Sequence, residues 1–219
     1  MANIKTILLV GSSIDGKVTV GSGLSSKAFS KMLTPAMATP INKLRVWADA
    51  VVVSRSTVEN DNPSLVSATN PNLVRVILDR KLQLSADKKV FSQPHTTMVM
   101  TAVSKKHPQI KVLEEIGIEV ICLDKATFLK EVKKTLISRN LLKVMVEGGG
   151  TFNSVLFNEK WIDELIVAYF PFLLGGKLTP TIYDGGEHSS IAEAISTKLI
   201  SHEVIDSHMI VAHYKILYN

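Results

Sequence analysis

The chain alternates short, continuously apolar runs with longer segments in which apolar residues recur at helical spacing. The apolar runs are bounded by Gly, Ser and Asp, which is typical of strands that are buried on both faces of a sheet. They predict strands at residues 6–10, 50–53, 74–78, 98–100, 118–121, 144–146 and 165–170. Strands of this kind need helices to cover them.

Two of the intervening segments carry clear helix signals. Thr39 is suited to cap a helix that has Pro40 in its first position and Ile41, Leu44 and Ala48 on one face. Residues 126–139 form the strongest amphipathic pattern, with lysines on the polar face. Its apolar stripe consists of Phe128, Leu129, Val132, Leu136 and Ile137. The alternation of strand and helix predicts an α/β sheet with helices packed over its faces.

The last quarter of the chain has a different pattern. Two apolar stretches flank Asp206-Ser207, which predicts an antiparallel hairpin with its turn at these two residues. The sheet is therefore expected to be mixed: mostly parallel, with a C-terminal antiparallel hairpin. No internal repeat or linker divides the 219 residues, so we expect a single domain over residues 1–219.

Composition narrows the class of protein. The chain has 25 Lys and Arg against 20 Asp and Glu, a net charge of +5 that favours anionic partners. The single cysteine, Cys122, excludes an intramolecular disulfide and a multi-cysteine metal site, and it favours a reducing compartment, the cytoplasm. It is most simply a small buried apolar residue. The six histidines show no metal-binding spacing, so we expect no metal. No export signal is present, and the apolar stretch 165–174 is too short to span a membrane, so a soluble protein is expected.

The strongest local motif is the run of glycines from Gly148 to Gly150, which follows a predicted strand ending at Glu147. A helix is expected to follow, with Phe152, Val155 and Leu156 on its inner face. Glycines let the backbone approach a ligand, and N–H groups at a helix start attract phosphate. The spacing matches neither G-x-G-x-x-G nor a P-loop, so a flexible strand-to-helix turn is an equal alternative.

Two further polar segments follow predicted strands. The first, residues 54–65, is interpreted as a polar loop in which Thr57 and Asp61 are four residues apart. Ligand sites in α/β sheets gather at the carboxyl ends of strands, although an N-capped turn ended by Asn62-Pro63 is the alternative. The second, residues 12–17, predicts a tight turn at Asp15-Gly16.

Taken together, the motifs resemble the reductase domain of riboflavin biosynthesis, a family similar to dihydrofolate reductase in fold. The resemblance runs nearly from end to end. In chain order it is carried by Ser13-Ile-Asp-Gly-Lys17, Leu44-Arg45 before Ala48-Asp49-Ala50, Ser-x-Thr57-Val-x-x-Asp61-Asn-Pro-x-Leu65, Val146-Glu-Gly-Gly-Gly-Thr-x-Asn153, Asp163-Glu164-Leu165 and Pro171-x-Leu-Leu-Gly-Gly176.

The resemblance implies an NADPH-dependent enzyme that reduces the ribosyl group of a phosphorylated aminopyrimidine to a ribityl chain, by hydride transfer to C1′. It also suggests a homodimer. The cofactor-binding residues that it implies are Gly11, Ser12, Thr57, Asp61, Arg80, Gly149, Gly150, Thr151, Phe152, Asn153, Ser154 and Val155. The substrate-binding residues that it implies are Ser25, Arg45, Leu65 and Glu147. Arg80 would read the 2′-phosphate of NADPH, and Arg45 would grip the substrate phosphate as a bidentate donor.

The sequence departs from the family at two places. Ala68 stands where many relatives have Arg, and Lys27 stands where relatives often have Trp. Lys27 could supply the missing charge, or the substrate could be a pterin-like or other molecule. A non-catalytic nucleotide-binding or nucleic-acid-binding protein is the alternative outside enzymes, although the chain has no basic run with stacking aromatics. With one cysteine, the chain cannot supply the zinc ligands of the deaminase that is joined to some relatives.

Overall fold

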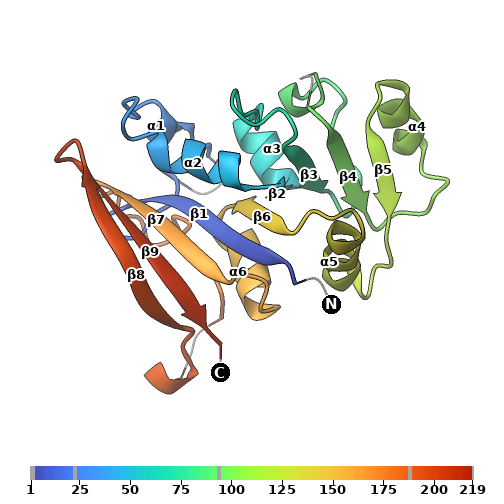
Figure 1. The fold of residues 1–219 in the computed structure, drawn as a ribbon. Helices are drawn as coiled ribbons and strands as arrows, with labels where there is room; N and C mark the ends of the chain where they lie inside the picture. The colour runs from blue at the N-terminus through green and yellow to red at the C-terminus, as the bar shows by residue number, and fades with distance from the viewer. Residues whose placement is uncertain (1–2, 22–23, 93–94, 187–188, 219) are drawn as a thin grey trace. The chain divides into compact units, whose positions relative to one another are not determined.

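The computed structural model describes residues 3–21, 24–92, 95–186 and 189–218. The chain divides into two compact units (Figure 1). The first contains residues 1–5 and 42–146, and the second contains residues 6–41 and 147–219. Helix α2, Thr39–Trp47, has residues in both units. The single domain expected from the sequence stays a prediction.

The first unit is built on parallel strands. Its strands are β2 (Ala50–Ser54), β3 (Val74–Leu78), β4 (Thr97–Thr101), β5 (Glu119–Cys122) and, up to Val146, β6 (Lys143–Glu147). They lie in the order β5-β4-β3-β2-β6, and β2 to β5 pair in parallel. Every residue of β2 and of β4 is buried, as the apolar runs 50–53 and 98–100 within them predict.

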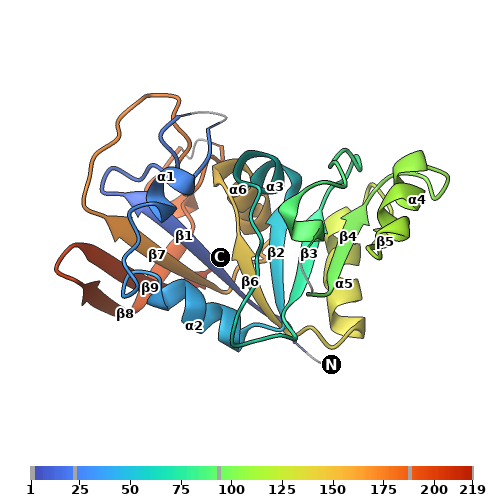
Figure 2. The ribbon, with the colours of Figure 1, turned by 90° about the horizontal axis from the view of Figure 1, so that it is seen from above.

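The helices of the first unit follow its strands. They are α3 (Arg55–Asp61), η1 (Lys89–Phe91), α4 (Pro108–Glu115) and α5 (Phe128–Ser138). Helix α4 lies next to β5 in both ribbon views (Figure 2). Of the predicted stripe of α5, Phe128, Val132 and Leu136 are buried, and Leu129 and Ile137 are half-buried.

The second unit combines one parallel pair with an antiparallel hairpin. Strand β1 (Lys5–Ser13) pairs in parallel with β7 (Glu164–Phe170). Strand β9 (Met209–Leu217) is antiparallel to β7 and to β8 (Ser196–Ile205). The remaining elements are α1 (Lys27–Ser30), α6 (Gly150–Asn158) and η2 (Ile191–Glu193). The core of this unit contains Phe29, Met37, Ala168, Phe170, Met209 and Val211.

These units confirm the expected fold class: a mixed α/β structure with mostly parallel strands, flanking helices and a C-terminal antiparallel hairpin. The hairpin turn lies where the sequence predicts it. Asp206 and Ser207 have φ values of 52° and 57°, the left-handed conformation that tight hairpin turns require. Within the described residues, no helix is long and apolar enough to cross a membrane.

Three expectations about individual elements were wrong. Residues 55–61 form helix α3, with Ser54 as its N-cap and Asn62 as its C-cap, so the polar loop was wrong and the alternative of an N-capped turn ended by Asn62-Pro63 is closer to the structure. Thr39 is the first residue of α2 instead of its cap. Thr39 N donates a hydrogen bond to Ala36 O, so the preceding turn runs directly into the helix. Cys122 is only partly buried, because β5 is the outermost strand of its unit.

Candidate active site

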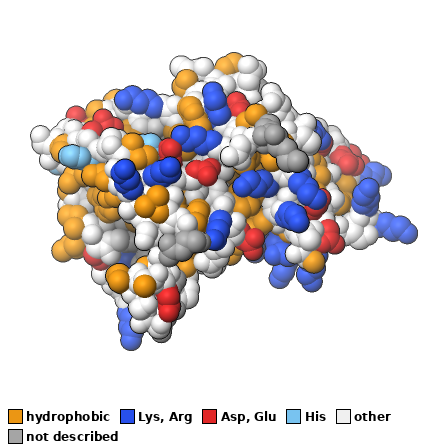
Figure 3. Space-filling view, turned by 60° about the horizontal axis from the view of Figure 1, so that its bottom comes forward, with side chains coloured by type: hydrophobic (Ala, Val, Ile, Leu, Met, Phe, Trp, Pro, Cys, Tyr) orange, Lys and Arg blue, Asp and Glu red, His pale blue; other side chains and the backbone are white. Residues whose placement is uncertain are grey.

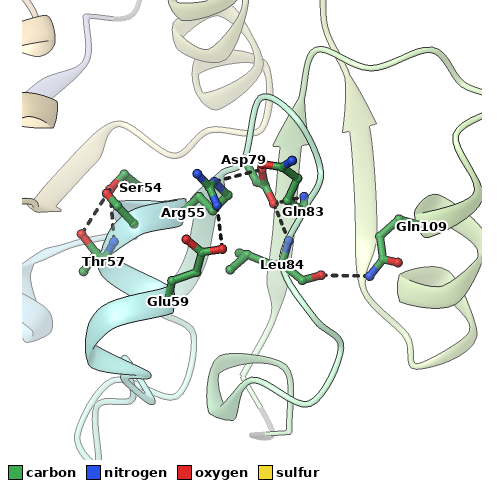
Figure 4. Close-up of polar contacts among 9 residues, drawn as sticks. Ser54, Arg55, Thr57, Glu59, Asp79, Gln83, Leu84 and Gln109 are labelled. Atoms are coloured by element: carbon green, nitrogen blue, oxygen red, sulfur yellow. Dashed lines mark hydrogen bonds and ion pairs between the residues drawn. The ribbon is translucent and has the colours of Figure 1, made fainter. Parts of the chain in front are cut away.

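The start of α3 fixes the position of Thr57. Ser54, the last residue of β2, has an extended backbone, and its hydroxyl accepts a hydrogen bond from Thr57 N at 3.4 Å. The Ser54 and Thr57 hydroxyls lie 3.2 Å apart (Figure 4). Asp61 ends the same helix, one turn further along, and is half-buried. Residues four apart lie on one helix face, so α3 brings the predicted cofactor-contacting pair together.

A charged cluster that the sequence analysis missed lies beside this helix (Figure 4). Arg55 Nη1 is 2.6 Å from Glu59 Oε1, and Arg55 Nε is 3.9 Å from Asp79 Oδ1. The Asp79 side chain is fully buried, and its Oδ2 accepts hydrogen bonds from Gln83 N and Leu84 N at 2.7 and 2.9 Å. Arg55 and Asp79 each follow the last residue of a strand, and the two strands pair in that register. The position of both residues directly after paired strands was the sequence signal that could have identified this cluster.

Arg80 is already engaged within its own unit. Its Nη2 donates to Lys125 O at 2.9 Å, and its guanidinium lies 5.2 Å from the centre of the Phe128 ring. Both contacts direct the side chain toward the start of α5. Reading of the 2′-phosphate by Arg80 therefore stays a prediction, and binding would have to compete with these contacts.

Arg45 and Leu65 occupy neighbouring parts of the first unit. Arg45, on α2, donates from Nη1 to Val66 O at 3.1 Å. Leu65 is 1% exposed and has a φ of 53°. Because the Leu65 side chain belongs to the core, any substrate contact at this position would come from its main chain.

The three glycines have different surroundings. A Cβ on Gly148 would lie 2.6 Å from Asn153 Oδ1 and 2.7 Å from Phe152 Cδ1. A Cβ on Gly150 would overlap Asp184 and the carbonyl of Thr181. Nothing lies within 4 Å of a Cβ on Gly149, which caps α6 without a side-chain hydrogen bond. The glycine run is thus closely packed at both ends and open in the middle.

The face of α6 differs from the sequence-based expectation. Val155 is 45% exposed, and the buried residues of this helix include Asn153, Ser154, Leu156 and Phe157. Asn153 Nδ2 donates to Ile182 O at 3.0 Å, and Ser154 Oγ donates to Gly150 O at 2.7 Å. These bonds satisfy Asn153 Nδ2 and the Ser154 hydroxyl, whereas Asn153 Oδ1 is buried and has no hydrogen-bond partner among the described residues. Thr151 is exposed, and Phe152 is half-buried.

The segment 172–184 connects this helix to the turn after β1. Ile14 N donates to Phe172 O and Val18 N donates to Pro180 O, both at 3.0 Å. Asn153 and Gly150 contact the other end of the segment, as described above. Two motifs that lie far apart in the sequence therefore share one supporting segment in the second unit.

Asp15 fastens the turn to this segment. Its carboxylate accepts hydrogen bonds from Leu174 N at 3.0 Å and from Gly175 N at 2.7 Å, as well as from the Ser13 hydroxyl. The Ser13 hydroxyl and these two backbone donors lower the pKa of Asp15 to about 2. The predicted tight turn is confirmed, with a φ of 81° at Gly16.

Of the remaining predicted residues of the second unit, Gly11 and Ser12 are closely packed, and Ser25 and Glu147 are half-buried. A Cβ on Gly11 would lie 3.2 Å from Phe170 Cε2. Ser12 is fully buried, and its hydroxyl donates to Ser13 O at 3.0 Å. Ser25 is half-buried and accepts from Lys27 N at 3.1 Å, whereas Glu147 is half-buried at the end of β6.

On the face drawn in Figure 3, Lys and Arg side chains are spread among acidic and apolar ones and form no single large patch. In the part of the chain that the structure describes, no group of three or more His, Cys, Asp or Glu side chains could hold a metal ion. His188 lies outside the described residues.

Comparison with known proteins gives a consistent result. Residues 5–211 match the RibD C-terminal domain family. The chain is 28% identical over 196 residues to the 2,5-diamino-6-ribosylamino-4(3H)-pyrimidinone 5′-phosphate reductase of Aquifex aeolicus, covering 88% of each chain. It is 27% identical to the Archaeoglobus fulgidus protein of the same name, covering 80% of this chain and 84% of the relative.

Other relatives are longer than this chain. The chain is 27% identical to the riboflavin biosynthesis protein RibD of Chlamydia pneumoniae over 81% of its own length and 48% of that protein. The solved structure of Acinetobacter baumannii RibD aligns with a TM-score of 0.82 and 25% identity, over 100% of this chain and 59% of that one. The chain thus spans about half the length of the RibD proteins that it matches.

Proposed function

Because the chain belongs to the RibD C-terminal domain family, we propose that it is the reductase of riboflavin biosynthesis that uses NADPH. Its substrate would be a phosphorylated pyrimidine whose ribosylamino group becomes a ribitylamino group. Relatives that carry the reductase name and align over 88% and 84% of their lengths support this assignment. The cytoplasm is the proposed compartment, since a lone cysteine suits a reducing environment.

The observation that carries the proposal is the start of α6. Helix α6 has nine residues, its Gly149 cap offers no side-chain acceptor, and open space surrounds Gly149. The first N–H groups of a helix have no partner within the helix, and they favour phosphate through geometry and dipole. The residues present therefore fit a dinucleotide pyrophosphate at this point.

In the first unit, the proposed cofactor contacts include two residues of α3. Thr57 and Asp61 offer a hydroxyl and a carboxylate from one face of α3. The proposed contacts also include Arg80, Gly11, Ser12 and the run from Gly149 to Val155. For the buried Ser12 and Asn153, contact would come from the main chain or from positioning of their neighbours.

The substrate side of the proposal rests on four residues. Arg45 would bind the phosphate, and Glu147 would accept hydrogen bonds from the pyrimidine or the sugar. Ser25 and the main chain of Leu65 would complete the contacts. Lys27 is exposed at the start of α1, and Ala68 is exposed on the loop between α3 and β3.

The proposed chemistry needs no side-chain nucleophile. Bound NADPH supplies the hydride that reduces C1′ of the opened sugar. The task of the protein is to hold the donor and acceptor carbons in contact and to exclude water. This division of labour agrees with a site made mainly of backbone donors, hydroxyls and carboxylates.

An oxidation assay tests the proposal. Purified protein is mixed with NADPH and the ribosylaminopyrimidine 5′-phosphate, and loss of the reduced-nicotinamide absorbance is followed. The account predicts oxidation that depends on the substrate. Tight NADPH binding without oxidation would instead favour a reductase of the same fold with a pterin-like or other substrate, which the Ala68 departure motivates. A protein that binds no dinucleotide would contradict both assignments and favour a non-catalytic binding protein.

A further inference from the structure

The loop that joins α3 to β3 is held by side chains that bind its main-chain carbonyls. Arg75 Nη1 donates to Ser64 O at 3.1 Å, and Arg45 Nη1 donates to Val66 O at 3.1 Å. The His95 ring lies with Nε2 at 3.4 Å from Ser67 O. These side-chain contacts connect the main chain of residues 64–67 to α2, β3 and the segment before β4.

Arg75 is the buried member of this set. It lies in β3, paired in register with Val51 and Thr97, and its side chain has no exposed surface. Its Nη2 also donates to the carbonyl of His95, so it connects the loop to the start of β4. Burial lowers the pKa of Arg75 to about 10, which leaves the guanidinium charged at neutral pH.

Burying a guanidinium costs several kcal/mol that an apolar side chain would not incur. The two residues that follow Arg75 in β3, Val76 and Ile77, are fully buried. Apolar side chains therefore fit the buried positions of this strand. Arg75 differs from them because its guanidinium donates hydrogen bonds to the carbonyls of Ser64 and His95.

The held loop contains a strained residue. Leu65 has a φ of 53°, a conformation that costs a branched or bulky residue of order 1–2 kcal/mol. Such a conformation persists only where the surroundings enforce it, and it is concentrated at functional sites. Here Arg75 binds the carbonyl of Ser64, the residue before Leu65, and Arg45 binds the carbonyl of Val66, the residue after it.

We propose that Arg75 is a positioning residue for substrate binding, which holds the Ser64 carbonyl so that the main chain of Leu65 faces the phosphorylated pyrimidine in one fixed conformation. The proposal rests on the function proposed above, since it takes Leu65 and Arg45 as the substrate side. It assigns Arg75 no contact with substrate or cofactor. Loss of the hold should loosen the loop and weaken substrate binding, while the cofactor residues on α3 and α6 keep their positions.

The test compares Arg75→Lys with Arg75→Met and with a matched control, Asp49→Ala. Lysine keeps the charge but can hold only one of the two carbonyls well. Asp49 also holds main-chain groups of the first unit, through hydrogen bonds from Leu142 N and Lys143 N at 2.9 and 2.8 Å, but it does not touch the loop. Each variant is assayed for KM, kcat, NADPH affinity, thermal midpoint and hydrogen exchange of peptides covering residues 62–67.

We expect Arg75→Lys to raise KM for the pyrimidine substrate by about tenfold, which corresponds to about 1.4 kcal/mol. Amide exchange in residues 64–67 should accelerate, with kcat and NADPH affinity within about twofold of wild type. Asp49→Ala should lower the thermal midpoint without changing KM. If Arg75→Met does not fold, the KM of Arg75→Lys and its amide exchange in residues 64–67 still test the inference.

An unchanged KM in a folded Arg75→Lys protein would overturn the inference, as would an equal loss of substrate and cofactor affinity. A wild-type protein that fails to oxidise NADPH with this substrate is a different result. It would contradict the proposed function itself, and the exchange of residues 64–67 would then show only whether Arg75 holds the loop.

Discussion

The glycine run can be tested one residue at a time, because an added methyl group would meet different surroundings at each position. Gly150→Ala should lower the free energy of unfolding by about 1–3 kcal/mol, since the methyl overlaps Asp184 and Thr181. Gly149→Ala should cost less than about 1 kcal/mol but weaken NADPH binding by about tenfold, because the methyl occupies the open space at the helix start.

Denaturant unfolding and an NADPH titration check both statements. Equal cofactor affinity in Gly149→Ala and the wild type would remove the glycine run from the cofactor site. Equal stability of the Gly149→Ala and Gly150→Ala proteins would show that segment 172–184 does not pack on α6 as described.

Asp61 offers a second residue-level prediction with a control on the same helix. Asp61→Ala should weaken NADPH binding by about tenfold to a hundredfold, the usual loss for a hydrogen bond to a charged group, while the fold survives. Glu59→Ala removes the other carboxylate of α3, whose partner is Arg55. That variant should bind NADPH nearly as the wild type does. Similar affinities for all three proteins would exclude Asp61 from the site.

Residue-level expectations from sequence succeeded where a single local rule decides. Gly16 has a positive φ at the predicted turn, and Asp206 and Ser207 do the same in the hairpin. They failed on α6, where an apolar pattern placed Val155 inside. The structure buries Asn153 instead, because its Nδ2 donates a hydrogen bond to the carbonyl of Ile182, a residue 29 positions away. Such a partner cannot be read from local spacing.

At the scale of elements, the turn after β1 supplies a pH-dependent contact. The pKa of Asp15 is lowered from 3.8 to about 2 by its hydrogen bonds, so the folded state favours the ionised carboxylate. The contribution of Asp15 to stability is therefore fully present above about pH 4 and is lost as the pH falls through about 2.

We expect Asp15→Asn to lower the thermal midpoint at neutral pH and to match the wild type at about pH 2. Thermal unfolding of both proteins over this pH range measures the difference. A difference that is constant with pH would show that the Asp15 carboxylate does not hold Leu174 and Gly175 in solution.

The strands were the most predictable elements, because a short apolar run such as residues 50–53 of β2 is typical of a strand that is buried on both faces. Residues 74–78 form β3 with the predicted bounds. Helix α3 was missed because residues 55–61 contain one buried apolar side chain, Val58, and otherwise read as a loop. The capping serine was the signal for it. The pairing of the strands, and the support that segment 172–184 gives to two motifs, depend on contacts that only the structure provides.

At the scale of the whole molecule, β8 predicts self-association. Among the described residues of its unit, β8 pairs only with β9, and Leu199, Ile200 and Val204 on it are 50%, 50% and 63% exposed. Apolar side chains gathered on an exposed strand usually mark an interface, and a second copy on a two-fold axis is the simplest occupant. We therefore propose a homodimer that covers β8.

Light scattering with size-exclusion chromatography checks this proposal. The wild type should elute as a dimer, and Leu199→Glu with Val204→Glu should elute as a folded monomer. Lys106→Glu, at an exposed position of the first unit, serves as the control for added negative charge. A monomeric wild type at micromolar concentration would rule the dimer out.

The account as a whole depends on hydride transfer from NADPH to the sugar carbon of a phosphorylated pyrimidine. The most direct measurement uses NADPH fully deuterated at C4 of the nicotinamide ring, so that either hydride face carries the label. After incubation with the ribosylaminopyrimidine 5′-phosphate, mass spectrometry and NMR should find a single added deuterium at C1′ of a ribityl product. NADPH that stays reduced, or a product without deuterium at C1′, would contradict the account.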